Sequence, residues 1–477
     1  MEVRIPYSTM LSQPQVEEVH ETSLKILQEI GVSTDSRTIL KLCEDAGAQV
    51  DVKSGRIRIS KEMVENSFKT IPRNIKLYGR DPQNDIVLKN GSVYFGLGGT
   101  GVPYIRDLDT EAIRTTTKKD VENSTRLGDA LSGISFVMTL ASASDCPGEV
   151  QYLHELEVKF NNTMKPILHP VPGTWFARKV LEMAETVAGG TEEFQKRPNI
   201  GVISENLSPL YYSRETENII EFAKKKAPVV LLPAPTLAST GPGTMIGTFC
   251  LANAESLFGI VLSQLTEPGA PVVMGPAIGI MDMRTTKYCY TDIGTCMGKI
   301  MTAQMARFYG LPSFCAGTGA SDAKIPDAQA GAEAALSALI GAQSGVNIVY
   351  NVGTMAGGTL GSFELAVIGD EVIGMIQHLA KGVTVNSETL AFDVLKEIGP
   401  EGNFLSHNHT LSLFRKELYF PKLFNRESVQ TWLKKGERNI FDEAKERAKE
   451  IIRNHKVPAL SEAQQADLSK IIKEAAR

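Results

Sequence analysis

LPSFCAGTGASDAKIPDAQAG occupies residues 311–331 of this chain of 477 residues. Its apolar start, residues 312–315, is typical of a buried strand. The small residues at 316–320 let the backbone approach a neighbour or a ligand closely, and an alanine-rich helix is predicted over residues 327–343. A strand, a glycine-lined turn and a helix form one unit of a parallel α/β fold, in which ligands bind beyond the carboxyl ends of the strands. The pattern also fits a βα loop whose glycines only make turns.

The same unit recurs along the chain. Strand-like apolar runs, each followed by a helical pattern, return about every 27 to 45 residues, as βα units do. The runs cover residues 134–140, 166–170, 200–204, 228–232, 271–274, 312–315 and 347–350. Residues 383–386 are the candidate for an eighth strand. Eight such units predict the α/β class and a (β/α)8 TIM barrel, with a doubly wound sheet as the structural alternative.

The two ends of the chain differ from this repeat. Residues 1–120 begin with an amphipathic helix and continue with short alternating segments, so we predict an N-terminal α+β extension packed on the barrel. The helix covers residues 13–30, and the alternating segments cover residues 56–59, 75–78 and 92–95. The barrel is assigned to residues 121–400. Residues 401–477 are predicted to form a C-terminal helical segment whose charged faces are solvated.

The composition is that of an ordinary globular protein, with 42% hydrophobic and 22% charged residues. The net charge of −5 argues against nucleic acid as a partner. The six cysteines are scattered without a CxxC pair, and the N-terminus lacks a signal-peptide core, so we expect a cytoplasmic protein. Residues 249–265 are apolar, but Asn253, Glu255 and Gln264 interrupt them and indicate a buried helix instead of a membrane span.

Two short patterns resemble known ligand motifs and are given other interpretations. Residues 96–101, GLGGTG, have the glycine spacing of a nucleotide loop, but no βαβ unit with a downstream acidic residue surrounds them, so a turn-rich hairpin is favoured. His407 and His409 are the one close histidine pair. The seven histidines show no HxxxH spacing and no grouping with cysteines, so no metal site is predicted.

Polar residues follow several of the predicted strands at the same point of the repeat. In a barrel these positions lie at the carboxyl ends of the strands, where catalytic residues are found. They are His169, Glu205, Asn206, Thr318, Gly319, Tyr350 and Asn351. Each of them alone could be a satisfied buried polar group. Their shared position in the repeat favours a functional site.

The stretch at 311–331 also resembles a known family. Residues 310–313 read GLPS and residues 316–324 read AGTGASDAK, which is similar to the pyrrolysine segment of the trimethylamine methyltransferase family. Gly319 or Ala320 stands where pyrrolysine would be, with one extra residue nearby. The resemblance extends over nearly the whole chain. Further matching stretches are residues 79–81, 99–102, 253–255, 387–391 and 403–405.

The resemblance implies an activity and a partner. Members of this family transfer a methyl group from an amine nitrogen to Co(I) of a cognate corrinoid protein. Relatives without pyrrolysine include methyltransferases for glycine betaine, carnitine and proline betaine, so the resemblance implies a quaternary amine substrate, with glycine betaine as the first choice and γ-butyrobetaine as another alternative. The cobalamin belongs to the partner, because this chain has no DxHxxG pattern and is expected to bind no cofactor itself.

A quaternary ammonium has no N–H to donate and is held by aromatic faces, helped by a carboxylate. Candidate walls are Phe95, Tyr104, Tyr288, Tyr290, Tyr350 and Phe363, although aromatic residues also fill cores. A betaine carboxylate needs hydrogen-bond donors. The candidate donors are Arg284, His169, Asn351 and His409. Glu205 and His169 are the candidate catalytic residues, and Gly319 is expected to leave room for substrate.

Two further interpretations stay open at this point. The chain could be a non-catalytic quaternary-amine binding protein on the same fold, or an unrelated barrel enzyme in which the SDAK segment is coincidental. An open funnel wide enough for a corrin face would favour the methyltransferase, and a sealed pocket would favour the binder. A homo-oligomer is possible, because barrels of this size often pair through their helices.

Overall fold

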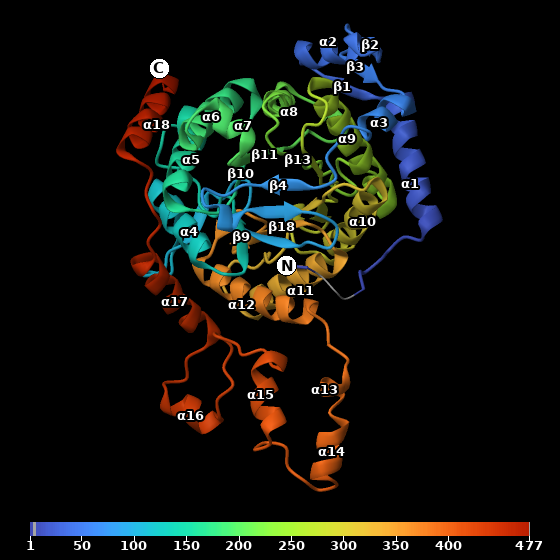
Figure 1. The fold of residues 1–477 in the computed structure, drawn as a ribbon. Helices are drawn as coiled ribbons and strands as arrows, with labels where there is room; N and C mark the ends of the chain where they lie inside the picture. Colours follow the sequence, from blue (N-terminus) through green and yellow to red (C-terminus); the bar gives the residue numbers. More distant parts are fainter. Residues whose placement is uncertain (3–5, 477) are drawn as a thin grey trace.

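The computed structural model describes residues 1–2 and 6–476, and its centre is a closed barrel of eight parallel strands (Figure 1). Each strand pairs with the next one along the chain, and a bridge between Met274 and Ser313 joins the two ends of the sheet. The strands are β6 (Tyr94–Leu97), β9 (Ile134–Val137), β10 (Ile167–Pro170), β11 (Ile200–Ser204), β13 (Val229–Leu231), β14 (Val272–Met274), β17 (Phe314–Cys315) and β18 (Ile348–Val352). The predicted (β/α)8 fold is therefore confirmed.

A ring of helices covers the outside of the barrel (Figure 1). These helices are α4 (Lys118–Ala130), α5 (Gln151–Asn162), α6 (Gly173–Ala188), α7 (Thr191–Lys196), α8 (Asn218–Lys224), α9 (Met245–Thr266), α10 (Ile293–Tyr309), α11 (Ala328–Ser344) and α12 (Phe363–Ala380). Helix α9 is long and apolar enough to cross a membrane, but 83% of its most apolar window is buried inside the fold. Its interpretation as a buried helix is confirmed.

A hairpin from the N-terminal part closes one end of the barrel. Strands β4 (Ile75–Leu77) and β5 (Ile86–Leu88) lie across the ring of strands in Figure 1. Their apolar side chains share one hydrophobic cluster with residues of the barrel interior, among them Phe314 and Tyr350, whose rings stack with centroids 4.5 Å apart. Because this end is filled, the opposite end, where the strands terminate, is the open mouth of the barrel.

Two strand predictions were wrong. Residues 92–95 were assigned to the extension, yet β6 is the first strand of the barrel. Residues 383–386 were the candidate eighth strand, but Val383 and Val385 are 87% and 73% exposed and pair with nothing in the described chain. Gly96 explains why residues 92–95 were not recognised as part of the barrel. A Cβ there would lie 2.2 Å from the Phe136 ring, so the neighbouring strand fills this position and β6 lacks the apolar run of its partners.

The remaining N-terminal elements pack outside the barrel near α9 and α10. They are α1 (Gln13–Lys25), which continues as a π-helix over Ile26–Ile30, β1 (Val32–Thr34), α2 (Arg37–Asp45), β2 (Gln49–Asp51), β3 (Arg56–Arg58) and α3 (Lys61–Ser67). The predicted helix over 13–30 is thus confirmed, with its end at Gly31. Strand β1 pairs with the short β12 (Tyr211–Tyr212) of the barrel's connections. The boundaries at residues 120 and 400 stay predictions.

The C-terminal part leaves the barrel and returns to it. After α12 come α13 (Ser387–Leu390), α14 (Phe392–Ile398), α15 (Asn408–Glu417) and α16 (Val429–Lys434), which project away from the ring of helices (Figure 1). We call residues 381–439 the arm. Helix α17 (Ile440–Asn454) then packs against α12 and α4, and α18 (Glu462–Ala475) packs against α6.

Candidate functional site

Three hairpins surround the mouth of the barrel. After β6 comes β7 (Tyr104–Arg106) with β8 (Ile113–Thr115), after β14 comes β15 (Ile280–Asp282) with β16 (Lys287–Cys289), and after β18 comes β19 (Thr354–Met355) with β20 (Leu360–Gly361). Strand β20 also pairs with β7, so two hairpins form one small sheet. Residues 96–101, which were expected to form a turn-rich hairpin, instead form the end of β6 and the loop that leads into the first hairpin.

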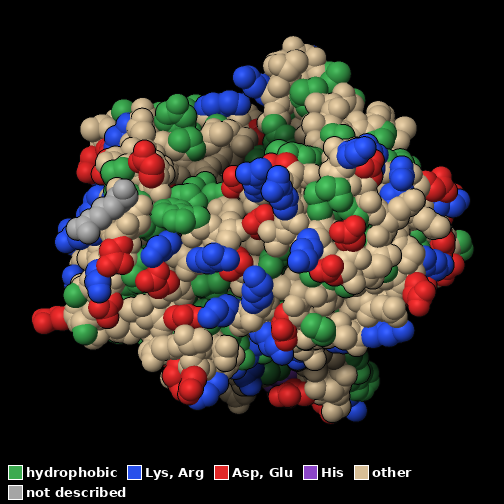
Figure 2. Space-filling view, turned by 90° about the horizontal axis from the view of Figure 1, so that it is seen from above, with side chains coloured by type: hydrophobic (Ala, Val, Ile, Leu, Met, Phe, Trp, Pro, Cys, Tyr) green, Lys and Arg blue, Asp and Glu red, His purple; other side chains and the backbone are tan. Residues whose placement is uncertain are grey.

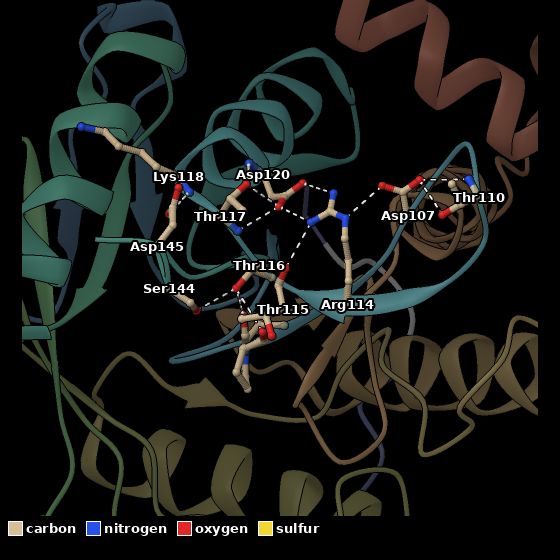
Figure 3. Close-up of polar contacts among 12 residues, drawn as sticks. Asp107, Thr110, Arg114, Thr115, Thr116, Thr117, Lys118, Asp120, Ser144 and Asp145 are labelled. Atoms are coloured by element: carbon tan, nitrogen blue, oxygen red, sulfur yellow. Dashed lines mark hydrogen bonds and ion pairs between the residues drawn. The ribbon is translucent and has the colours of Figure 1, made fainter. Parts of the chain in front are cut away.

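Charged side chains fasten the first hairpin to the barrel (Figure 3). The Arg114 guanidinium lies between two carboxylates and donates to Asp107 at 3.0 Å and to both oxygens of Asp120 at 2.7 and 2.9 Å. The hydroxyls of Thr116 and Ser144 lie 3.1 Å apart and join the hairpin to the loop after β9. Bidentate pairs of this kind fix direction as well as distance, so this rim is a firm part of the mouth.

A pair of tyrosines comes from the second hairpin. The rings of Tyr288 and Tyr290 meet edge to face, with centroids 5.2 Å apart. Glycines make room for both rings. A Cβ at Gly279 would lie 2.6 Å from the Tyr288 ring, and one at Gly358 would lie 3.0 Å from the Tyr290 ring. The close approach of backbone to ring at these glycines therefore determines where the tyrosine pair lies.

Asp322, from the SDAK segment, holds Tyr290 in place. Its carboxylate accepts hydrogen bonds from the backbone N–H groups of Tyr290 and Thr291 at 3.0 Å each, and from the Thr291 hydroxyl at 2.9 Å. Glu333 of α11 in turn accepts from the Asp322 N–H at 2.7 Å. Gly317 has a φ of +67°, and a Cβ there would lie 2.4 Å from the Tyr290 carbonyl oxygen. The stretch at 311–331 thus holds the tyrosine pair through hydrogen bonds and close packing against its backbone.

Glu205 lies directly after β11, among these tyrosines. Solvent reaches it through the mouth, but protein atoms surround it on the other sides, and this burial raises the pKa of its carboxyl to about 7. Burial raises the pKa values of Tyr288, Tyr290 and Tyr350, and the charge of Glu205 raises them further. Such coupling requires short range. One carboxylate is therefore grouped with the two tyrosines of the second hairpin at the mouth, whereas Tyr350 is fully buried in the barrel interior.

A cavity of about 330 Å³ opens beside Glu205, within the usual size range of small-molecule sites. A second carboxylate, Glu215, and the ring of Tyr152 also line it. A smaller cavity of about 20 Å³ lies against Tyr288, Tyr290 and the buried Lys299, whose Nζ donates to the Gly317 carbonyl at 2.7 Å. The larger cavity is acidic and partly aromatic, which suits a small organic cation.

The structure brings together four of the residues predicted from the sequence: Glu205, Tyr288, Tyr290 and Tyr350. Tyr104 lies on the first hairpin and is 47% exposed. Arg284 lies at the tip of the second hairpin, where it extends into solvent and pairs with Asp282 at 2.7 Å.

Three predicted wall or donor residues lie elsewhere. Phe95 and Phe363 are buried in the hydrophobic layer between the barrel and its helices, because the side chains of a strand alternate and Phe95 faces outward. His409 belongs to α15 of the arm, where its Nε2 lies 3.0 Å from the Glu388 carbonyl. Neither the barrel mouth nor the cavities include these three side chains.

Three further predicted residues support the mouth from behind. The Asn351 Oδ1 accepts from the Gly317 N–H at 2.8 Å. A Cβ at Gly319 would point at the Val352 side chain, 2.9 Å away, and not into a cavity. His169 is fully buried behind the barrel wall, 3.0 Å from the Lys159 Nζ, and burial followed by the Lys159 charge lowers its pKa well below the ordinary value. A neutral imidazole with Nδ1 accepting and Nε2–H donating to the Tyr152 carbonyl fits these contacts.

Sequence reasoning missed Tyr152, Glu215, Lys299 and Asp322 as site residues. Lys299 carried a usable signal, because it is a lone base inside the otherwise uncharged helical pattern of residues 293–306. Asp322 lies inside the quoted motif, but its side chain was not singled out there as a site residue. Tyr152 and Glu215 follow no strand directly, so only the folded chain shows that they reach the cavity.

Comparisons with known proteins agree with this architecture. Residues 1–477 match the family described as "Trimethylamine methyltransferase (MTTB)". The chain is 36% identical over 466 residues to a trimethylamine methyltransferase of Desulfitobacterium hafniense, covering 97% of this chain and 93% of that protein. It is 32% identical over 471 residues to a glycine betaine methyltransferase of another strain of that organism, covering 98% and 97%.

Among solved structures, the monomethylamine methyltransferase of Methanosarcina barkeri matches with a TM-score of 0.54 and 12% identity, over 95% of this chain and 89% of that one. That likeness concerns the fold alone. The sequence matches show the family as well as the fold, because they span both chains nearly from end to end. This chain therefore belongs to the trimethylamine methyltransferase family, whose members transfer methyl groups from methylated amines to corrinoid proteins.

Proposed function

We propose that this chain demethylates a quaternary amine and passes the methyl group to Co(I) of a cognate corrinoid protein. The grouping of Glu205 with Tyr288 and Tyr290 at the barrel mouth carries this proposal. A quaternary ammonium has no N–H to donate, so aromatic faces and a nearby negative charge are the contacts that can hold it. The acidic cavity beside Glu205 supplies an entry for such a cation.

Glycine betaine is the proposed substrate, and dimethylglycine the product. One of the relatives over the full length is named for this substrate. Of the predicted carboxylate donors, Arg284 and His409 lie away from the cavities, and Asn351 lines neither of them. We assign the role to Lys299 instead, because its ammonium is buried next to the tyrosine pair and retains donors beyond the one given to Gly317. Proline betaine, carnitine and γ-butyrobetaine carry the same two charged groups on larger frames.

The reaction balances without a proton donor. The electron pair of Co(I) forms the new bond to the methyl carbon, the C–N bond breaks, and its electrons stay on nitrogen, which leaves as a neutral tertiary amine. The chain's own task is then to hold the ammonium against the tyrosine faces, to aim one N–CH3 bond out of the mouth, and to keep water from the cation. Glu205 acts in this scheme as a negative charge, and His169 as a positioning residue that contacts Tyr152 from behind.

The methyl acceptor has to reach the substrate through the mouth, because the β4–β5 hairpin fills the other end of the barrel. We propose that the corrinoid protein docks over the three hairpins there and brings its own cobalamin. The six cysteines of the chain are all free thiols, in keeping with a reducing cytoplasm as the proposed location.

The test is methylation of the Co(I) corrinoid protein, followed by absorbance, with a panel of methylated amines. The panel holds glycine betaine, proline betaine, carnitine, γ-butyrobetaine and trimethylamine. We expect methyl-Co(III) to form with glycine betaine and with no other member at a comparable rate. Methylation by a different quaternary amine would correct the substrate. Methylation by trimethylamine alone would overturn the proposal, since a tertiary amine needs an activation that this site does not provide.

A further inference from the structure

The arm, residues 381–439, is a folded segment without a core. It starts at the end of α12, extends away from the ring of helices through α13, α14 and α15, and returns through α16 (Figure 1). None of the described residues in these four helices is buried. The helices have four to ten residues each. Isolated helices shorter than about 12–15 residues are only marginally stable in water, so the arm needs a surface to pack on.

Polar contacts define the shape of the arm and fasten its base. Within the arm, the His409 Nε2 lies 3.0 Å from the Glu388 carbonyl, which ties α15 to α13. At the base, Glu371 of α12 accepts hydrogen bonds from the Tyr419 hydroxyl at 2.7 Å and from the Lys422 N–H at 2.9 Å. The arm is therefore held in a definite position, although its four helices contain no buried residue in the described chain.

Those apolar side chains are large and exposed. Phe392 is 71% and Leu405 is 78% exposed, and Leu390, Leu395 and Leu411 are each more than half exposed. Exposed apolar side chains that gather on one part of a soluble protein mark an interaction site. On the face shown in Figure 2, by contrast, basic and acidic side chains are interspersed among the others.

A groove lies beside the returning part of the arm. It has a volume of about 730 Å³, and Phe420, Phe424 and Trp432 supply aromatic walls. Four basic and two acidic side chains line it as well. Lys435 pairs with Glu427, and Arg438 pairs with Glu443 at 3.2 Å. The charges of Lys422 and Arg426 remain in excess, so the groove is aromatic and basic.

The tip of the arm, residues 392–402, has the complementary character. It carries the exposed Phe392 and Leu395 together with Asp393, Glu397 and Glu401, against the single base Lys396. The tip cannot enter the groove of its own chain, because α14 and α16 lie on opposite sides of α15 (Figure 1). An acidic, apolar tip and a basic, aromatic groove on one chain can satisfy each other only between two copies.

We propose that the arm is the interface through which two copies of this chain associate, with the tip of each copy seated in the groove of the other. This contact is reciprocal and closes on itself, as a two-fold interface does. A docked corrinoid protein would not compete for it. Helices of a barrel start at the mouth and end at the far side, so the arm leaves α12 at Ala380, at the end opposite the mouth.

The first test is sedimentation of the full chain across the micromolar range. The native protein is expected to sediment as a dimer or a larger even-numbered assembly. Phe392→Ser combined with Leu405→Ser is expected to give monomers with an unchanged circular dichroism spectrum. Val52→Ser removes a similarly exposed apolar side chain far from the arm and serves as the control, which should remain associated. A native protein that stays monomeric throughout this range would overturn the proposal.

The second test uses charge reversal and does not depend on apolar packing. Glu397→Lys and Arg426→Glu should each weaken self-association at least tenfold. The double variant restores opposite charges between the two copies and should recover most of the loss. Two losses that simply add, without recovery, would contradict seating of the tip in the groove. Neither residue lies at the mouth, so a failure of methyl transfer would leave this result unaffected.

Discussion

The carboxyl of Glu205 makes the site sensitive to pH. Burial disfavours its charged form and raises its pKa to about 7, whereas a bound ammonium favours the charged form. Protonated and ionised sites therefore coexist near neutral pH, and only the ionised one attracts the substrate. The affinity for a cation should follow the ionisation of this one group.

We predict that glycine betaine binds about tenfold more weakly for each pH unit below 7 and reaches a plateau above it. Calorimetric titrations between pH 5.5 and 8.5 measure this directly. Glu205→Gln is the control and should bind weakly at every pH, without the slope. An equal slope in Glu205→Gln would assign the pH dependence to another group.

The same pKa shift predicts the effect of pH on stability. Because the folded-state pKa is raised, the folded protein binds more protons than the unfolded chain between the ordinary pKa and about 7. The contribution of Glu205 to stability is therefore greatest at low pH and is lost as the pH rises through 7. Glu205→Gln should raise the melting temperature at pH 8 and leave it nearly unchanged at pH 4, and a uniform shift in thermal melts would contradict this.

Tyr290 is predicted to hold the ammonium through its ring. Tyr290→Leu should weaken substrate binding roughly tenfold, since a desolvated cation–π contact contributes about 1–2 kcal/mol. Tyr290→Phe keeps the ring and should bind nearly as well as the native protein. Dissociation constants of the two variants at pH 8 give the comparison. Equal losses in both variants would point to the hydroxyl and away from the aromatic face.

At the scale of elements, the loop after β17 supports the hairpin that follows β14. Asp322 connects them by accepting three hydrogen bonds from Tyr290 and Thr291. Asp322→Ala should raise the KM for substrate by tenfold or more, because the tyrosine pair loses its anchor, while the barrel stays folded. Lys324→Ala changes a neighbouring exposed residue and should have no such effect. A lowered melting temperature with an unchanged KM would reduce Asp322 to a purely structural role.

The glycine turn itself provides a prediction about stability. Gly319 has a φ of +68°, and its missing Cβ faces Val352. Gly319→Ala should lower the free energy of unfolding by about 1–2 kcal/mol from the left-handed backbone alone, and more from the contact. Gly331→Ala, in the open helical surface of α11, should be neutral or stabilising by about 0.5–1 kcal/mol. Denaturant unfolding of both variants tests the contrast, and equal effects would contradict it.

The repeat of apolar runs predicted seven of the eight barrel strands because both faces of those strands are buried, against the interior and against the helices. Residues 92–95 were recognised as strand-like but assigned to the N-terminal extension, because Gly96 leaves its interior position to Phe136 and shortens the apolar run of β6. Residues 383–386 alternate like a strand, but alternation says nothing about whether a neighbouring strand exists. Pairing is decided by tertiary structure, which explains both errors.

The residues of the candidate site were predictable where they follow a predicted strand of the repeat. Glu205 follows β11 directly, and the Tyr288–Tyr290 pair lies in a polar stretch after β14, so position alone singled them out. Tyr350 was expected at a strand end but lies in the middle of β18. The sequence could not predict on which face of its strand His169 lies. Its side chain points outward, to Lys159. Nor could spacing along the chain predict that His409 lies in the arm.

At the scale of the whole molecule, the two ends of the barrel have separate tasks. The N-terminal hairpin closes one end, and in the proposed reaction the mouth at the other end is where substrate and methyl acceptor meet. The arm leaves the molecule at the closed end. Association of two copies through the arms would therefore leave both mouths open for their corrinoid partners.

The most direct test of this account is a single-turnover measurement with the chain, its Co(I) corrinoid partner and glycine betaine. Methyl-Co(III) is followed by absorbance, and dimethylglycine is determined in the same samples. We predict one dimethylglycine for each methyl-cobalt formed, and a rate that falls with the weakened binding in Tyr290→Leu. Methyl-cobalt without dimethylglycine, or an unchanged rate in Tyr290→Leu at limiting substrate, would contradict the claim that this mouth delivers a quaternary amine to cobalt.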